Sequence, residues 1–374
     1  MLSLLAATVL AAGQEPVARF MALTEPDKKQ PPRLSIYIRD TPLDPPKFSP
    51  KLFGDPAQRW QFDWISSAFG PDPNSPRDPE TGEQQGKVRF RVFSQIKKRG
   101  EYDYTVLVAR QAIRMWDVLF NKYRIRHNEA VNRGIVDYYL CWGGQAGGEY
   151  VKGEDIAPDN KAITVSTIYI YDIRSFTKPV EMAREVAHEY GHAVLPAVGG
   201  YTEPEYWANG HLGEKFLMRV LRDQFAKGVI VADDVMGATL EELNAWVKAN
   251  VDPLVVRTAS TPPSIAQLKD RGKPGADAYA GLVLYADTIL PANIVTRSMM
   301  IMGSQNAEDY PDALLRATQE VPKVTLAIPA YLKNKPLWVP LGKGKVAQAQ
   351  ILGRSGDWAK IQPQAGAVVI TTGK

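Results

Sequence analysis

The segment His188-Glu189-Tyr190-Gly191-His192 constrains the fold of this chain more than any other stretch of its sequence. Its two histidines are four residues apart, and residues at that spacing lie one turn apart on the same face of an α-helix. Two imidazoles on one face can reach a single metal ion, at roughly 2.0 to 2.1 Å from each nitrogen. The pattern therefore predicts a helix over about residues 178–195, with Pro179 in its first turn and Pro196 ending it.

The same five residues predict a hydrolytic metal site. Zinc lowers the pKa of a water molecule bound to it to about 7, and a carboxylate beside the metal can then take the proton of that water. Glu189 lies next to the histidine face and has the right chemistry for this base. We therefore predict Zn²⁺ as the cofactor, His188 and His192 as two of its ligands, and Glu189 as the catalytic base.

A catalytic zinc site usually has a third protein ligand. The next histidine along the chain is His211, and Glu214 follows one turn later on a helix predicted over about residues 203–225. Gly210 and Gly213 would let this helix approach the first one closely. The alternative is that His211 and Glu214 are ordinary surface residues, because isolated charged residues on helices are usually solvated.

Three segments resemble the gluzincin metallopeptidases, the thermolysin- and aminopeptidase-like group. They are the motif HEYGH, the stretch from Trp207 to Phe216 (WANGHLGEKF) and the stretch from Tyr279 to Tyr285 (YAGLVLY). The resemblance covers roughly residues 100 to 320. It implies a zincin fold, a zinc ion and the hydrolysis of peptide bonds, and it implies that Tyr279 stabilises the oxyanion.

The sequence departs from the family pattern at the third ligand. Aligned on Trp207 and Asn209, the ligand glutamate of the family falls on Gly210, which has no side chain to offer. Counted from the motif, the family spacing falls on His211 instead. We favour His211 as the ligand and Glu214 as the acidic residue that orients a ligand histidine, with Glu214 as ligand left open. The departure also leaves open a site with weakened metal binding, or with none.

Hydrophobic periodicity predicts the elements around this site. Alternating or β-branched runs predict strands at about residues 34–38, 88–93, 135–142 and 162–173. The last of these is the strongest, and a substrate could pair with a sheet edge beside the helix. Helical spacing predicts further helices at about residues 104–123, 240–249, 276–290, 294–302 and 309–318. A capping box, Thr202-x-x-Glu205, predicts the start of the helix that carries His211.

The order of these elements predicts an α+β fold. We expect a zincin-like domain with a mixed sheet and an active-site helix, a helical half, and a small C-terminal β module. The predicted organisation is a signal peptide (1–13), an N-terminal strand and loop region (14–99), a catalytic subdomain (100–225), a helical subdomain (226–335) and the β module (336–374).

The N-terminus and the composition indicate where the protein acts. Leu2 to Ala12 are apolar and small residues follow, which predicts a cleaved signal peptide and a secreted or periplasmic protein. The stretch has no Lys or Arg before it, so a buried N-terminal element is the alternative. No other apolar run reaches about 18 residues, so we predict no integral membrane segment. Cys141 is the only cysteine, which excludes an intrachain disulfide, and its apolar neighbours predict a core residue.

The chain has 45 basic and 41 acidic residues, and this mild excess predicts no nucleic-acid partner. The leading hypothesis is therefore a secreted zinc peptidase acting on a peptide or protein substrate. The second is a non-catalytic zincin-like protein that binds peptides or a surface, and the third is a cytosolic structural protein. The sequence does not decide between endopeptidase and aminopeptidase action, and it leaves the oligomeric state unknown.

Overall fold

The computed structural model describes the chain in separate ranges. These are residues 19–22, 35–39, 66–70, 90–94, 103–125, 136–141, 143–156, 162–202, 205–303, 305–364 and 366–372. Side chains are described from residue 90 onward, except at residue 103 and at 152–156 and 162–165. The predicted signal peptide at 1–13 lies outside the described residues.

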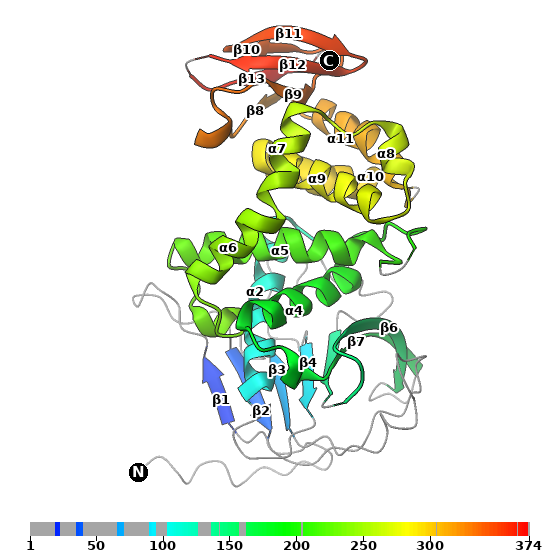
Figure 1. Cartoon of the computed structure of the whole chain (residues 1–374), viewed down its shortest axis with the longest axis vertical. Helices are drawn as coiled ribbons and strands as arrows, with labels where there is room; N and C mark the ends of the chain where they lie inside the picture. Colours follow the sequence, from blue (N-terminus) through cyan, green and yellow to red (C-terminus); the bar gives the residue numbers. More distant parts are fainter. Residues whose placement is uncertain are drawn as a thin grey trace.

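A seven-stranded mixed sheet forms one end of the molecule (Figure 1), in the order β1-β2-β3-β4-β5-β7-β6. The strands β4, β5 and β7 run parallel, and all other neighbouring pairs are antiparallel. The strand bounds are β1 Arg19–Ala22, β2 Ser35–Arg39, β3 Ser66–Gly70, β4 Phe90–Ser94, β5 Val136–Leu140, β6 Gly147–Ile156 and β7 Ala162–Tyr171. Strand β6 therefore forms one edge of the sheet.

Helices cover this sheet in successive layers. Helices α2 (Asp103–Asn121) and α4 (Pro179–Val194) contact the sheet, and α5 (Ala208–Ala226) packs along the other side of α4 (Figure 1). The motif helix α4 is buried on both sides, as its uncharged residues Val186 and Ala187 require. Its observed bounds agree with the predicted helix to within one residue at each end.

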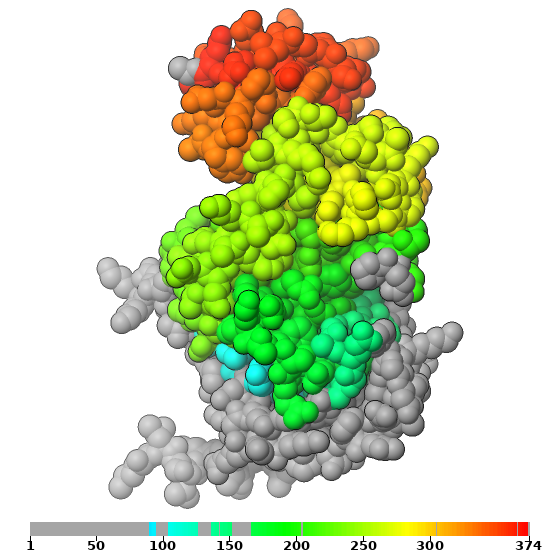
Figure 2. Space-filling model, viewed as in Figure 1, coloured from blue at the N-terminus to red at the C-terminus, as the bar shows by residue number. Residues whose placement is uncertain are grey.

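The rest of the chain stacks on α5 toward the far end of the molecule (Figures 1 and 2). Its helices are α6 Leu240–Asn250, α7 Asp252–Ser260, α8 Ile265–Lys269, α9 Lys273–Ile289, α10 Ala292–Ile301 and α11 Tyr310–Gln319. The C-terminal β module holds two three-stranded sheets, β10-β13-β8 and β11-β12-β9. Its strands are β8 Lys323–Thr325, β9 Leu337–Pro340, β10 Lys345–Ala347, β11 Ala349–Ser355, β12 Trp358–Pro363 and β13 Val369–Thr371.

This is a mixed fold of sheet and helices, compatible with the predicted α+β class. All four predicted strands are present near their expected positions, and Cys141 is buried as predicted. Three features differ from prediction. Helix α5 begins at Ala208 rather than near residue 203, with Trp207 at its N-cap and no side-chain cap, so the predicted capping box is wrong. Strand β7 is internal, and the sheet edge is the unpredicted strand β6. The sequence analysis also missed the short helices α7 and α8.

Within the described part of the chain, no helix combines the length and the apolar character needed to cross a bilayer.

Candidate metal centre

Helices α4 and α5 touch at their backbones, and glycines make this approach possible. A Cβ atom added to Gly191 on α4 would lie 2.5 Å from the carbonyl oxygen of Asn209 and 2.7 Å from the Cα of Gly213. A Cβ atom added to Gly210 would overlap the imidazole of His192. No side chain fits at these contacts, and the close approach brings the N-terminal end of α5 against the metal-binding motif.

The two motif histidines point to the same place. Their Nε2 atoms lie 3.3 Å apart, and the rings are inclined to each other by 70°. Ligand atoms of His188, Glu189 and His192 all lie within 4.8 Å of one another. This group could hold a metal ion, as the spacing of the motif predicted.

Glu205 completes the group from a segment that precedes α5. Its Oε2 atom lies 3.2 Å from Nε2 of His188, and its Oε1 atom lies 3.6 Å from Nε2 of His192. The side chain is 11% exposed, and Oε1 is buried without a hydrogen-bond partner among the described residues. The backbone N–H of His211 donates a hydrogen bond to the carboxylate and so orients it. Sequence reasoning did not single out Glu205 as a candidate ligand.

The hydrogen bonds of His192 fix which of its nitrogens carries the proton. The amide Nδ2 of Asn209 donates to the carbonyl oxygens of Gly191 and His192, at 3.4 and 3.3 Å. Oδ1 of Asn209 is thereby turned toward Nδ1 of His192, at 3.2 Å. We infer that Nδ1 donates to this oxygen, which leaves a lone pair on Nε2.

Glu214 has the same effect on His188. Its Oε2 atom lies 3.3 Å from Nδ1 of His188, so Nδ1 donates to the carboxylate, and Nε2 is the nitrogen that offers a lone pair once the imidazolium loses its proton. Arg184 and Lys215 hold the carboxylate in place, at 2.8 and 2.7 Å. Glu214 therefore contacts the nitrogen of His188 that faces away from His192. This geometry agrees with an orienting role for Glu214 rather than with a ligand role.

These donors suit a metal cation. Two imidazole lone pairs and a carboxylate converge, and one oxygen of that carboxylate is buried and unpaired within the described ranges. Such an arrangement is repulsive unless a positive charge lies between the groups, either a proton held by His188 or a metal ion that takes its place. Two histidine nitrogens and one carboxylate oxygen form a common ligand set of catalytic zinc sites.

The pKa values in the centre show how the metal-free cluster balances its charge. Burial acts to lower the pKa of His188, but the hydrogen bond to Glu214 and the nearby carboxylates raise it to about 9. Burial and the charge of His188 lower the pKa of His192 to about 3. Burial raises the pKa of Glu205 to about 7 and that of Glu189 to about 8. The cluster therefore retains protons well above the pH at which isolated carboxylates lose theirs.

Glu189 lies between the ligands and the edge strand β6. A Cβ atom added to Gly148 on β6 would lie 2.5 Å from Oε1 of Glu189, so a side chain there would displace the Glu189 carboxylate. The side chain is buried, and Oε2 has no hydrogen-bond partner in the part of the chain that the structure describes. A cavity of about 580 Å³ adjoins this group, lined by residues of β6, α4, the segment before α5, α5, α6, α7 and α9.

His211 lies in this cavity but is not placed as a ligand. Its Nε2 atom is 2.8 Å from Oδ1 of Asp277, and its Nδ1 atom is 3.3 Å from Nζ of Lys215. A lysine ammonium only donates hydrogen bonds, so Nδ1 accepts and Nε2 donates to Asp277. Both ring nitrogens are therefore occupied, and the structure does not place His211 where the sequence analysis expected it.

Hydrogen bonds connect this second cluster to the metal centre. Lys215 contacts both His211 and Glu214, and Glu214 contacts His188. Asp277 belongs to α9, so a continuous chain of polar contacts runs from the helical half to a metal-facing histidine.

Tyr279 does not line the cavity. It is fully buried, and its ring meets that of Tyr310 edge-on with centroids 5.6 Å apart. Burial raises the pKa of its hydroxyl well above the ordinary value. The tyrosine that does line the cavity is Tyr201, which sequence reasoning did not single out.

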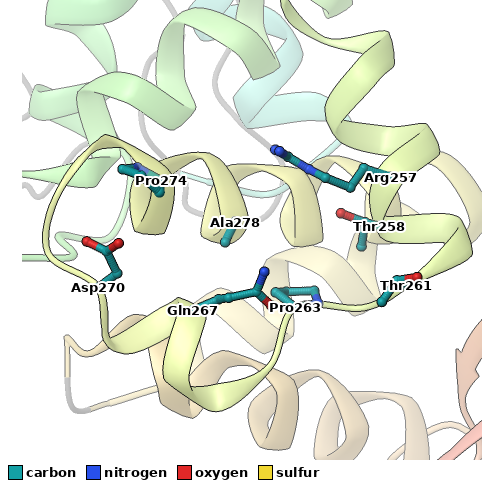
Figure 3. Close-up of a pocket in the computed structure, with 8 residues that line it drawn as sticks. All are labelled: Arg257, Thr258, Thr261, Pro263, Gln267, Asp270, Pro274 and Ala278. Atoms are coloured by element: carbon teal, nitrogen blue, oxygen red, sulfur yellow. The ribbon is translucent and has the colours of Figure 1, made fainter.

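A second cavity, of about 290 Å³, lies against the opposite face of α9 (Figure 3). Pro274 and Ala278 face it, whereas Ala276 and Asp277 face the metal cavity. Among the described residues, Asp270 is its only acidic lining residue, and no histidine lines it. The cavity beside the motif is therefore the candidate functional site.

Comparisons with models of protein families and with curated proteins find no match for this chain.

Proposed function

We propose that the protein is an exported zinc peptidase of the gluzincin type, which hydrolyses peptide bonds with a metal-activated water. His188, His192 and Glu205 are the zinc ligands, and Glu189 is the general base. The observation that carries the proposal is the convergence of two Nε2 lone pairs and the Glu205 carboxylate beside Glu189. Glu205 supplies the carboxylate that the sequence lacks at Gly210.

Zinc, when bound, supplies a Lewis acid and lowers the pKa of a coordinated water to about 7. The residues of the chain transfer the protons and orient the ligands. Glu189 takes a proton from the attacking water at its unpaired carboxylate oxygen and passes the proton to the leaving nitrogen. Glu214 and Asn209 keep the Nδ1 protons on His188 and His192, so that both Nε2 atoms stay available as ligands.

The edge strand β6 supports a peptide as the substrate. Its outer side has no neighbouring strand in the described sheet, and an extended peptide can add to such an edge through backbone hydrogen bonds. Gly147 and Gly148 line the cavity at the point where β6 passes Glu189. The absence of side chains there lets a substrate backbone come close to the base.

The decisive experiment combines metal content with peptide hydrolysis. We expect about one zinc per chain in the purified protein and cleavage of a mixed peptide library. We expect Glu189→Gln to keep the zinc and to lose at least roughly 100-fold in kcat. Zinc binding by both proteins without hydrolysis by either would favour the non-catalytic binding protein. Equal hydrolysis by both would remove Glu189 from the mechanism.

A further inference from the structure

The net charge of the chain conceals a strongly basic C-terminal module. Residues 323–374 contain eight Lys and Arg residues and one acidic residue, Asp357. Residues 1–322 hold the remaining 37 basic and 40 acidic side chains, so they are slightly acidic. The positive charge is therefore concentrated in one structural unit, at the end of the molecule opposite the seven-stranded sheet (Figure 1).

Several of these cations lie on the outside of the module. Lys345 on β10 and Lys323 on β8 both pair with Thr371 of β13, so all three residues share one row and one exposed face of that sheet. Lys343 is exposed in the turn before β10. Arg354 on β11 is exposed too, and its Nη1 atom donates to the carbonyl oxygen of Gly342 in that turn, at 2.7 Å. No ion pair joins these cations to an acidic group within the described residues.

Two exposed aliphatic side chains lie on β11, the strand that follows and contacts β10. Ile351 and Leu352 on β11 are 40% and 48% exposed. The pairing of β11 with β12 shifts register between Ile351 and Gly353, so Leu352 has no partner residue on β12. Figure 1 shows β10 and β11 on the outer side of the module, away from the helices. We call Lys343, Lys345, Ile351, Leu352 and Arg354 the outer rim.

We propose that the outer rim docks the protein on the surface of a bilayer that contains anionic phospholipids. The cations are attracted to the negative headgroups, and Ile351 and Leu352 enter the boundary between the headgroups and the acyl chains. The combination of charge and exposed aliphatic side chains favours this partner. A soluble polyanion would neutralise the cations but would not bury the aliphatic pair.

Edge protection and nucleic-acid binding each account for only part of the outer rim. Lysines on edge strands prevent pairing between sheets, but Lys343 lies in a turn, and edge protection does not call for Ile351 and Leu352 to be exposed. Binding of single-stranded nucleic acid uses aromatic side chains on which bases stack. Residues 343–355, which contain the rim, include no aromatic residue.

The test is co-sedimentation of the full-length chain with vesicles. Wild-type protein should bind vesicles of phosphatidylcholine and phosphatidylglycerol, should not bind phosphatidylcholine alone, and should bind less at high salt. The double variant Lys343→Glu/Lys345→Glu should lose at least about 25-fold in apparent affinity, at roughly fivefold for each lysine. The matched control is Lys227→Glu/Lys248→Glu, which changes the net charge equally at two exposed lysines of the helical body and should bind like wild type.

A second variant separates a lipid surface from a soluble polyanion. Ile351→Ser/Leu352→Ser keeps every charge and should weaken vesicle binding while leaving binding to inorganic polyphosphate unchanged. Three results would overturn the proposal: no binding of wild type to the anionic vesicles, equal losses in the rim and body charge variants, or no effect of the serine variant on vesicle binding. The measurement requires neither zinc nor catalysis, so it stands apart from the proposed peptidase function.

Discussion

Two buried clusters of histidines and carboxylates lie in the same cavity, and they differ in how completely their polar atoms are paired. In the cluster of His211, Asp277 and Lys215, each nitrogen of the histidine has a protein partner. In the cluster of His188, His192 and Glu205, the outer nitrogens are paired, while the two Nε2 atoms face one another and the Glu205 carboxylate. The first cluster is complete as a hydrogen-bond network, and the second needs a proton or a metal ion between its groups. Ring nitrogens that face one another, rather than the presence of histidine, distinguish the candidate metal site.

The largest expected effect comes from removing the carboxylate that faces the lone pairs. Glu205→Ala should lower zinc affinity by more than the roughly 10 to 100-fold that changes to residues behind the ligands cost. His211→Ala should lower it far less, because His211 contacts the centre only through its backbone and through Lys215. Titration of metal-stripped protein with zinc in competition with a chelator measures the zinc affinity of both variants. A larger loss for His211→Ala than for Glu205→Ala would assign the metal to the cluster of His211 instead.

The connection between the clusters should have an intermediate effect. Glu214→Ala removes the acceptor of the His188 Nδ1 proton and should lower zinc affinity by about 10 to 100-fold. Lys215→Met should cost less, since Arg184 still holds Glu214. Lys273→Met is the control. The Lys273 ammonium is exposed and pairs with Asp277, the residue of the hydrogen-bonded chain that is farthest from His188. If Lys273→Met lost as much zinc affinity as Glu214→Ala, the proposed connection through Lys215 and Glu214 would be contradicted.

The contact between α4 and α5 should affect stability as well as the site. Gly213→Val places side-chain atoms against the backbone of Gly191, where a Cβ alone would lie 2.5 Å from its Cα. We expect a loss of about 1 to 3 kcal/mol in the free energy of unfolding, measured with urea on metal-stripped protein. Gly353→Ala, where a Cβ meets no atom within 4 Å, should change stability by less than about 0.5 kcal/mol. Equal effects would show that the helices tolerate a wider spacing.

A pH dependence should also separate the two clusters, because only the metal cluster should show it. The pKa of His188 is raised from 6.5 to about 9, so its proton stabilises the metal-free fold fully below pH 6.5. That stabilisation is lost as the pH rises through 9. Zinc takes the place of this proton, so zinc affinity should rise with pH in this window, by up to about tenfold per unit. Competition with a chelator at several pH values checks this, and a flat profile would contradict it.

The sequence predicted the motif helix and the convergence of its two histidines, because both follow from the local geometry of one helical turn. It did not predict strand β6, whose residues Gly147–Ile156 include three glycines and several charged side chains that rarely signal a strand. It also favoured Tyr279, whereas Tyr201 is the tyrosine that lines the cavity, and both are buried.

The third carboxylate shows most clearly what the sequence left open. After His192, the next acidic residues are Glu203 and Glu205, and the sequence placed both inside a predicted helix as part of its first turn. Helix α5 begins later, and backbone contact through Gly191 and Gly213 sets its distance from α4. The position of two ligands depends on hydrogen bonds between neighbouring turns, which local sequence encodes. The position of Glu205 depends on how closely two helices pack, and only the tertiary structure decides that distance.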